Sequence, residues 1–259
     1  MARQSTKKIE DWLTFSFIET TLSDLHTPYS PYILIICRIK TMKPTIKIDF
    51  ISDVACPWCA VGLGNLNQAM AKLSDQFNFE VHFRPFELNP KMPQGGQDAI
   101  EHLTEKYGLS VEQVKANQAN IRAKALEAGF EFHPEGRKRV YNTFNAHRLL
   151  YWAAKEFNLE KQALLKKELL NTYFCLAVSL DDPENLLDAV SRAGLDCNRA
   201  RYVLSEDEFT QEVRAEESTY TNLGINSVPS IILNDQYLLQ GAQPPEQFIN
   251  AFEQLGKQA

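Results

Sequence analysis

Two short stretches near the start of the regular pattern predict β-strands with a helix between them. The run Thr45–Ser52 is largely apolar, and apolar and polar residues alternate over Phe79–Phe86, which is the period of a strand. Residues 57–74 have helical spacing and begin with a proline, which suits the first turn of a helix. Strand, helix and strand in this order usually give parallel neighbours.

Apolar residues then follow helical spacing almost throughout a long block. Capping boxes at Ser110-x-x-Gln113 and Ser205-x-x-Glu208 predict helices that end near Glu127 and Leu223. Asp182-Pro183 is typical of a further helix start. The remaining predicted helices cover residues 142–157 and 160–178. Residues 98–204 are therefore predicted to form a helical insertion subdomain.

Strand character returns after this block. Residues 230–233 and 237–239 are predicted strands joined by a turn at Asn234-Asp235, and a final helix covers residues 245–255. Without the insertion the order is β-α-β followed by β-β-α, which is the thioredoxin fold. The predicted class is thus α/β, a thioredoxin fold with a large all-helical insertion, its halves at residues 42–97 and 205–259.

Residues 1–41 differ in character from the rest of the chain, because they mix charges, Ser/Thr and prolines without a sustained period. Met42 opens the segment that leads into the first strand. One hypothesis is that Met42 is the true start and the upstream extension is not native. The rival is a genuine, poorly ordered arm, and an intact mass from the native source would decide between them.

The composition and net charge are those of a globular protein that does not bind nucleic acid. The 259 residues are 44% hydrophobic and 23% charged, as in an ordinary globular protein, and the net charge of −6 argues against nucleic-acid binding. The apolar run Tyr32–Cys37 is too short for a membrane span, and basic residues follow it without a cleavage pattern. We therefore expect no membrane association, and a cytoplasmic protein.

The strongest candidate for a reactive site is Cys56-Pro57-Trp58-Cys59, at the junction of the first predicted strand and helix. Two cysteines separated by two residues at this position are typical of reversible dithiol/disulfide exchange. A helix start offers free N–H groups and a partial positive charge, which favour a thiolate at Cys56. Trp58 either presents an aromatic face beside the sulfur or simply packs.

A zinc site is the competing interpretation of the two cysteines. Zinc usually needs a second cysteine pair or closely spaced histidines, whereas Cys37, Cys175 and Cys197 are single and the five histidines are scattered. We therefore predict no metal. Cys175 has apolar neighbours and is predicted to be a buried, inert thiol, while Cys197 follows Asp196 near a helix start and is predicted to be more exposed.

The second half of the site is predicted at Ser227-Val228-Pro229, directly before the third strand. In a thioredoxin fold a proline here is typically cis and lies against the cysteine pair. The backbone of Val228 would then bind an extended substrate by strand addition. His147 could be a base and Asn145 or Arg148 substrate contacts, but a capped or solvated role on an amphipathic helix is favoured for all three.

Several segments together resemble the FrnE-type branch of the DsbA-like thioredoxin-fold oxidoreductases. They are Ser52–Cys59, Pro85–Pro90, Asn142–Leu149, Ala193–Asp196 and Gly241–Gln243. The resemblance covers Met42 to the C-terminus and implies a cytoplasmic bacterial enzyme with Cys56 as nucleophile, Cys59 as resolving thiol and Pro229 as the cis-proline. Ser227 departs from the glycine that many members carry there.

The resemblance leaves three functions open. A thiol-disulfide oxidoreductase acting on protein or small-molecule substrates is favoured. The alternative is a glutathione-dependent isomerase or transferase of the kappa-class or 2-hydroxychromene-2-carboxylate isomerase type, whose members usually have serine in place of the first cysteine. The third is a holdase that grips unfolded partners with the helical insertion. No bound cofactor is expected, and glutathione as co-substrate and a homodimer are further hypotheses.

Overall fold

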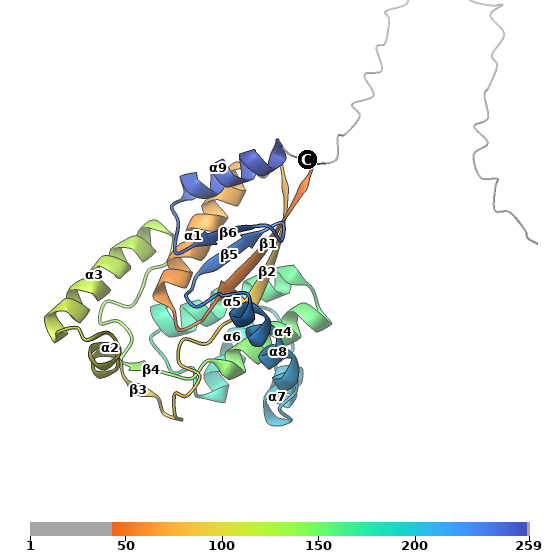
Figure 1. The fold of residues 1–259 in the computed structure, drawn as a ribbon. Coiled ribbons are helices and arrows are strands. Elements are labelled where there is room, and N and C mark those ends of the chain that lie inside the picture. The colour runs from red at the N-terminus through yellow and green to blue at the C-terminus, as the bar shows by residue number, and fades with distance from the viewer. Residues whose placement is uncertain (1–42, 258–259) are drawn as a thin grey trace, which may run out of the picture. The chain divides into compact units, whose positions relative to one another are not determined.

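The computed structural model describes residues 43–257. The predicted extension over residues 1–41, with Cys37, lies outside the described residues. The elements of the described part, labelled in Figure 1, are β1 (Thr45–Ser52), α1 (Pro57–Lys72), β2 (Asn78–Pro85), β3 (Gln97–Asp98), α2 (Ala99–Tyr107), α3 (Val111–Glu127), β4 (Arg139–Val140), α4 (Phe144–Glu156), α5 (Leu159–Leu170), the π-helical turn η1 (Asn171–Cys175), α6 (Pro183–Arg192), α7 (Cys197–Ser205), α8 (Thr210–Asn222), β5 (Ser230–Leu233), β6 (Tyr237–Gln240) and α9 (Pro245–Gly256).

The main sheet confirms the predicted topology. Its strand order is β2-β1-β5-β6, with β1 and β2 parallel and the other two pairs antiparallel. Phe50 at the centre of β1 pairs with Phe83 on β2 and with Ile231 on β5. Helices α1 and α9 pack against each other beside this sheet (Figure 1). The β-α-β and β-β-α halves of a thioredoxin fold are therefore both present.

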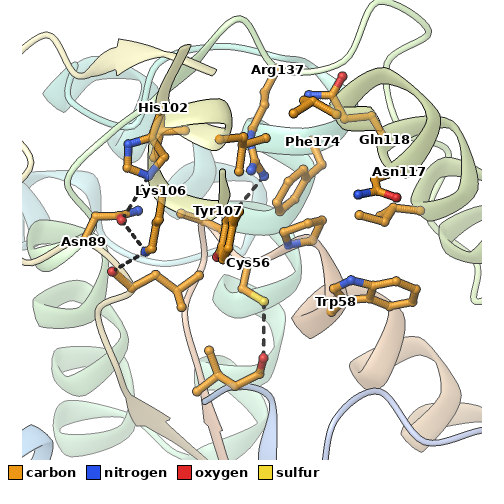
Figure 2. A pocket seen from close by; sticks show the side chains of 18 of the residues that line it. Cys56, Trp58, Asn89, His102, Lys106, Tyr107, Asn117, Gln118, Arg137 and Phe174 are labelled. Atoms are coloured by element: carbon orange, nitrogen blue, oxygen red, sulfur yellow. Dashed lines mark hydrogen bonds between the residues drawn. The ribbon is translucent and has the colours of Figure 1, made fainter. Parts of the chain in front are cut away.

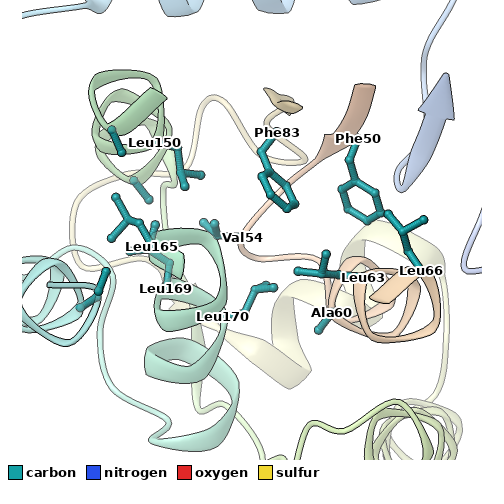
Figure 3. Packing of buried hydrophobic residues seen from close by; sticks show 14 of the residues in the cluster. Phe50, Val54, Ala60, Leu63, Leu66, Phe83, Leu150, Leu165, Leu169 and Leu170 are labelled. Carbon is teal, nitrogen blue, oxygen red and sulfur yellow. The ribbon is translucent and has the colours of Figure 1, made fainter. Parts of the chain in front are cut away.

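A single apolar core joins the thioredoxin halves to the helical insertion. In Figure 3, Phe50 of β1 and Leu63 and Leu66 of α1 lie on one side of this core, and Leu165 and Leu169 of α5 lie on the other. Each large side chain removed from water in this way stabilises the fold by about 1.5–3 kcal/mol. The insertion is thus part of the same packed unit as the sheet.

The insertion contains the predicted helices and one short ribbon that the sequence did not predict. The capping box that opens α3 is confirmed, because Ser110 Oγ accepts from the Gln113 amide and Gln113 Oε1 accepts from the Ser110 amide. Asp182 caps α6 through the Glu184 amide, also as predicted. Two-residue strands β3 and β4 pair in antiparallel fashion, so the insertion is helical except for this ribbon.

The capping box predicted at Ser205 is wrong. Ser205 ends α7, and its hydroxyl donates to the carbonyl of Tyr202, while α8 begins only at Thr210 after Phe209 in a left-handed conformation. The carboxylate of Glu208, which the motif would use to cap the helix, instead binds Arg199 at 2.5 Å. A tertiary ion pair therefore outcompetes the local cap.

The single helix predicted over residues 160–178 is also wrong in its second half. The α-helical part ends at Leu170 and a π-helical turn follows as far as Cys175. The hydroxyl of Thr172 donates to the carbonyl of Glu168, and such a bond between a threonine and the preceding turn perturbs helical backbone. The turn directs Tyr173 and Phe174 into the interior, where both are buried.

No helix within residues 43–257 combines the length and apolarity that crossing a bilayer requires.

Candidate active site

Cys56 occupies the N-cap position of α1, and Pro57 is the first helical residue, as predicted. The side chain of Cys56 is 4% exposed and that of Cys59 is fully buried. The Sγ atom of Cys56 lies 3.6 Å from the carbonyl oxygen of Val228 and donates to it. The Val228–Pro229 peptide bond is cis, which confirms the predicted geometry. Two segments that are distant in sequence thus meet at one sulfur.

The two thiols differ in acidity. A hydrogen bond from the Cys59 thiol is the main cause that lowers the pKa of Cys56, helped by the Cys59 amide and the charge of Arg137 and opposed by burial and by Asp53. Burial raises the pKa of Cys59 well above its usual value, and the neighbouring Cys56 raises it further. Because the thiolate is the attacking species in disulfide exchange, this difference in pKa favours attack by Cys56 over attack by Cys59.

Cys56 opens into a cavity of about 1010 Å³ between the first helix of the thioredoxin part and the helices α2 and α3 of the insertion. Figure 2 shows Trp58, Tyr107 and Phe174 around this space. Trp58 is 38% exposed and lines the cavity with Pro57 and Val228. A ligand in the cavity would therefore meet an aromatic face beside the sulfur. Pro229 is buried and does not line the cavity, and a Cβ at Gly62 of α1 would lie 3.1 Å from its Cγ atom.

Cationic side chains of the insertion also line the cavity, among them Arg137 and Lys106, which sequence reasoning did not single out. The Nη1 atom of Arg137 donates to the carbonyl of Ala55 at 3.1 Å, and its guanidinium lies over the rings of Tyr173 and Phe174. Lys106 Nζ binds Asn89 Oδ1 at 2.7 Å, and partial burial lowers the pKa of Lys106. An anionic group next to the thiol would find both positive charges within the same pocket.

The segment after β2, part of the motif that carried the family resemblance, organises this wall. Asn89 Oδ1 also contacts the ring of His102, and the Leu88 amide donates to Asp53 Oδ2 at 2.7 Å. The segment therefore ties α2 to the loop that carries the cysteines.

A set of buried polar residues lies beneath the cysteines. Asp53 is 1% exposed and accepts hydrogen bonds from the amides of Ala55 and Leu88. Its Oδ1 atom lies 3.6 Å from Nε2 of His147, which is also buried. Burial opposes ionisation of Asp53, but His147 and the two amides outweigh it, so that the pKa of Asp53 is lowered. Lys166 of α5 is fully buried as well, and its Nζ has no hydrogen-bond partner among the described residues.

Neither His147 nor Arg148 on α4 is solvated, because both side chains are buried. His147 contacts Asp53, and Arg148 Nε donates to the carbonyl of Glu208 in the link between α7 and α8. Helices α7 and α8 pack against α4 and cover the face that carries these two residues, which buries them although they are polar. Asn145 is exposed and accepts from Arg148.

The other described cysteines take no part in this site. Cys175 is half-buried, less covered than predicted, and burial raises its pKa, as expected of an unreactive thiol. Cys197 is also half-buried, and its thiol donates to the carbonyl of Leu187. Among residues 43–257 no group of three or more His, Cys, Asp or Glu side chains could hold a metal ion.

Comparison with known proteins identifies this architecture. Residues 47–253 match the family model described as the DSBA-like thioredoxin domain. The chain belongs to this family. It is 34% identical to a probable DsbA oxidoreductase from Streptomyces coelicolor, over 81% of this chain and 89% of that one, with a TM-score of 0.74. A thiol oxidoreductase family with a helical insertion is thus established for this chain.

Two structures of lower sequence identity share the fold. A 2-hydroxychromene-2-carboxylate isomerase has 16% identity and a TM-score of 0.58, with 82% of this chain and 97% of that one covered. The cytosolic disulfide reductase DsbM from Pseudomonas aeruginosa, solved with GSH, has 14% identity and a TM-score of 0.55, with 81% and 98% covered. The DsbA-like fold therefore occurs in both a reductase and an isomerase.

Proposed function

We propose that this protein is a thiol-disulfide oxidoreductase of the FrnE type that exchanges disulfides through Cys56 and Cys59. One observation carries the proposal. The Cys56 sulfur lies at the N-terminus of α1 and opens into a cavity, and the buried Cys59 thiol lowers its pKa by donating a hydrogen bond. A nucleophile with an adjacent protonated thiol is the arrangement that a two-step exchange requires.

The proposed cycle begins when the Cys56 thiolate attacks one sulfur of a substrate disulfide. A bond forms between Cys56 and that sulfur, and the other half of the substrate leaves as a thiolate. Cys59 then loses its proton and attacks Cys56, which forms the Cys56–Cys59 disulfide and releases the reduced substrate. Run in reverse, the oxidised pair accepts two electrons from a substrate dithiol.

The cavity supports glutathione as co-substrate. Glutathione carries carboxylates and a thiol, and the wall of the cavity offers Arg137 and Lys106 beside Cys56. The disulfide reductase with the same fold was solved with GSH and is described as cytosolic, so we propose the bacterial cytoplasm as the working compartment. The backbone of Val228, next to cis-Pro229, would hold the substrate chain beside the sulfur.

The first test is the reduction potential of the cysteine pair. The purified protein is equilibrated in glutathione redox buffers, its free thiols are alkylated, and the reduced fraction is read from the intact mass. We expect a two-electron transition between roughly −270 and −120 mV, absent from a Cys56→Ser variant. Thiols that stay free across the series would exclude the oxidoreductase function.

The isomerase is the second candidate, favoured by the volume of the cavity and by the isomerase with the same fold. Replacement of Cys59 by serine separates the two functions. C59S should abolish dithiol turnover, whereas a glutathione-dependent isomerisation would survive it. The assay uses 2-hydroxychromene-2-carboxylate with glutathione, and turnover by C59S equal to that of the wild type would favour the isomerase.

Two hypotheses from the sequence stay predictions. A holdase would still suppress aggregation of an unfolded model protein when both cysteines are serine, whereas the oxidoreductase would lose its activity. A homodimer would be recognised by light scattering at the mass of two chains.

A further inference from the structure

Arg122 of α3 is a half-buried arginine that lines the same cavity as Cys56. A Cβ at Gly136 would lie 4.0 Å from the Nη1 atom of Arg122, which places the guanidinium beside the loop before β4. No hydrogen bond or ion pair within residues 43–257 holds this side chain. The mechanism proposed above gives it no role.

The other cations of the cavity wall are already bound by the protein. Lys106 donates to two oxygens of the segment after β2. Arg137 donates to the carbonyl of Ala55, and its guanidinium lies over two aromatic rings. A guanidinium has five N–H donors and no acceptor. Because Arg122 spends none of them on the described part of the chain, all five are available to a ligand.

The charge of the cavity wall favours an anion. Glu87 is the single acidic residue among the described residues that line the cavity. Its side chain is 2% exposed and forms an ion pair with Arg214 of α8, so its charge is compensated by the protein. The remaining charged groups of the wall are Lys106, Arg122 and Arg137. This cavity is therefore positive in a chain whose net charge is −6, and a positive cavity attracts and holds anionic ligands.

Two side-chain amides of α3 lie next to this arginine in the cavity wall. Gln118 is one helical turn before Arg122, a spacing that puts both on the same face of α3. In Figure 2, Asn117 and Gln118 lie on one side of Cys56, and Lys106 lies on the other. Neither amide side chain forms a hydrogen bond within the described part of the chain. The thiol is thus flanked by polar groups on two sides.

We propose that Arg122 binds a carboxylate of the substrate, and that the cavity selects small disulfides with a carboxylate on each half. The inference rests on the proposed oxidoreductase function and names its substrate class. One guanidinium can donate two parallel hydrogen bonds to one carboxylate, and Lys106 attracts the second carboxylate from the opposite wall. The cavity of about 1010 Å³ has the volume of a large small-molecule site, which leaves room for both halves. Arg122 determines specificity and takes no part in the exchange of bonds.

The test uses three symmetric disulfides of similar length that differ in the charge of their ends. Dithiodipropionate is an anion, hydroxyethyl disulfide is neutral and cystamine is a cation. Reduced protein is mixed with each at pH 7, the reaction is quenched with acid at intervals, and intact mass gives the rate at which the reduced form disappears. The ratio of wild-type to variant rate is taken for each disulfide, which cancels the intrinsic reactivity of the compound.

Arg122→Gln should react about tenfold more slowly with dithiodipropionate, the size of one lost charge-assisted hydrogen bond. Its rate with hydroxyethyl disulfide should equal that of the wild type, and its rate with cystamine should not fall. An unchanged rate with dithiodipropionate would overturn the inference. A loss shared by all three disulfides would also overturn it, because that loss reports altered acidity of Cys56 or altered folding rather than a lost carboxylate contact.

Lys115→Gln is the matched control, because Lys115 is exposed on α3, lies outside the cavity wall and carries the same charge. It should react with dithiodipropionate at the wild-type rate, and a loss equal to that of Arg122→Gln would overturn the inference. If the wild type reacts with none of the three disulfides, the proposed function fails instead. The two failures are therefore distinguishable.

A second measurement needs no disulfide exchange. Suberate has the shape of dithiodipropionate with two carbons in place of the two sulfurs, and it should slow the alkylation of Cys56 by iodoacetamide. The suberate concentration that halves the alkylation rate should rise about tenfold in Arg122→Gln. Arg122→Lys keeps the charge without the planar fork and should recover part of the protection. No protection of the wild type, or equal protection of Arg122→Gln, would overturn the inference.

Discussion

Nε2 of His147 lies 3.6 Å from Oδ1 of Asp53, and both side chains are almost completely buried. The same carboxylate accepts from the amides of Ala55 and Leu88. Asp53 therefore joins helix α4, the segment after β2 and the loop that ends at Cys56. Asp53 thus helps to hold Cys56 in place, although Asp53 does not itself line the cavity.

Replacement of Asp53 by asparagine should destabilise the protein by about 1–3 kcal/mol at pH 7. Both carboxylate oxygens of Asp53 accept hydrogen bonds from backbone amides, and the amide nitrogen of asparagine cannot accept one. The pKa of Asp53 is lowered in the folded state. Its ionisation thus stabilises the fold above the unfolded pKa of about 3.9, and this contribution is lost as the pH falls through the folded pKa.

Urea unfolding between pH 7 and pH 3 measures the difference in unfolding free energy between wild type and Asp53→Asn. We expect it to be constant at neutral pH and to shrink below about pH 4. Asp75→Asn, at an exposed position, is the control. A difference that grows on acidification would contradict the prediction.

The acidity of Cys56 should depend on the donor at position 59. The hydrogen bond from Cys59 is the main cause of the lowered pKa of Cys56. Cys59→Ala removes the donor and should move the alkylation midpoint of Cys56 to higher pH, whereas Cys59→Ser keeps a hydroxyl and should move it less. Iodoacetamide labelling, quantified by peptide mass, measures both. Coincident profiles for the alanine variant and the wild type would show that this hydrogen bond is unimportant.

Arg137 should support the reaction with glutathione disulfide. Its charge lowers the pKa of Cys56, and it stands in the cavity wall. Arg137→Met should reduce the second-order rate of mixed-disulfide formation at pH 7 about tenfold, as expected for one charge-assisted hydrogen bond. Lys138→Met, at the exposed neighbouring position, should have the wild-type rate. A normal rate in Arg137→Met would exclude the guanidinium from substrate binding.

Gly64 should be required for the contact between α1 and the insertion. A Cβ at this position would lie 2.0 Å from the carbonyl oxygen of Ala128, at the end of α3. Gly64→Ala should lower the free energy of unfolding by about 3 kcal/mol, at the upper end of overpacking effects. Gly62→Ala meets a softer contact at 3.1 Å from Pro229 Cγ and should cost less. Denaturant unfolding of the two variants tests the order.

Local pattern was enough to predict the thioredoxin halves. The strand β1, the helix that begins at Pro57 and the α3 capping box were predicted correctly, because each depends on neighbours within a few residues. The cis bond before Pro229 was predicted as well, from the motif and the topology together. The cap at Ser205 failed because Glu208 binds Arg199 instead.

For Lys166, the sequence shows the residue type and its place on the helix, whereas only the tertiary structure shows its surroundings. A lysine on the apolar face of a helix is visible in the sequence, and this signal could have flagged it. What the lysine faces could not be known, because α5 and the cysteine loop are brought together by the shared core around Val54. The same holds for Arg137 and Lys106, which reach the cavity from loops and helices far along the chain.

The order of the main strands and helices, the cysteine pair at the start of α1 and the loop at Pro229 as its candidate partner could all be predicted from the sequence. The tertiary structure decided which charges surround those sulfurs and how acidic each thiol is. The physical reason is that secondary structure follows local periodicity and capping, whereas burial and electrostatic fields depend on residues far apart in the chain that the packed core brings together.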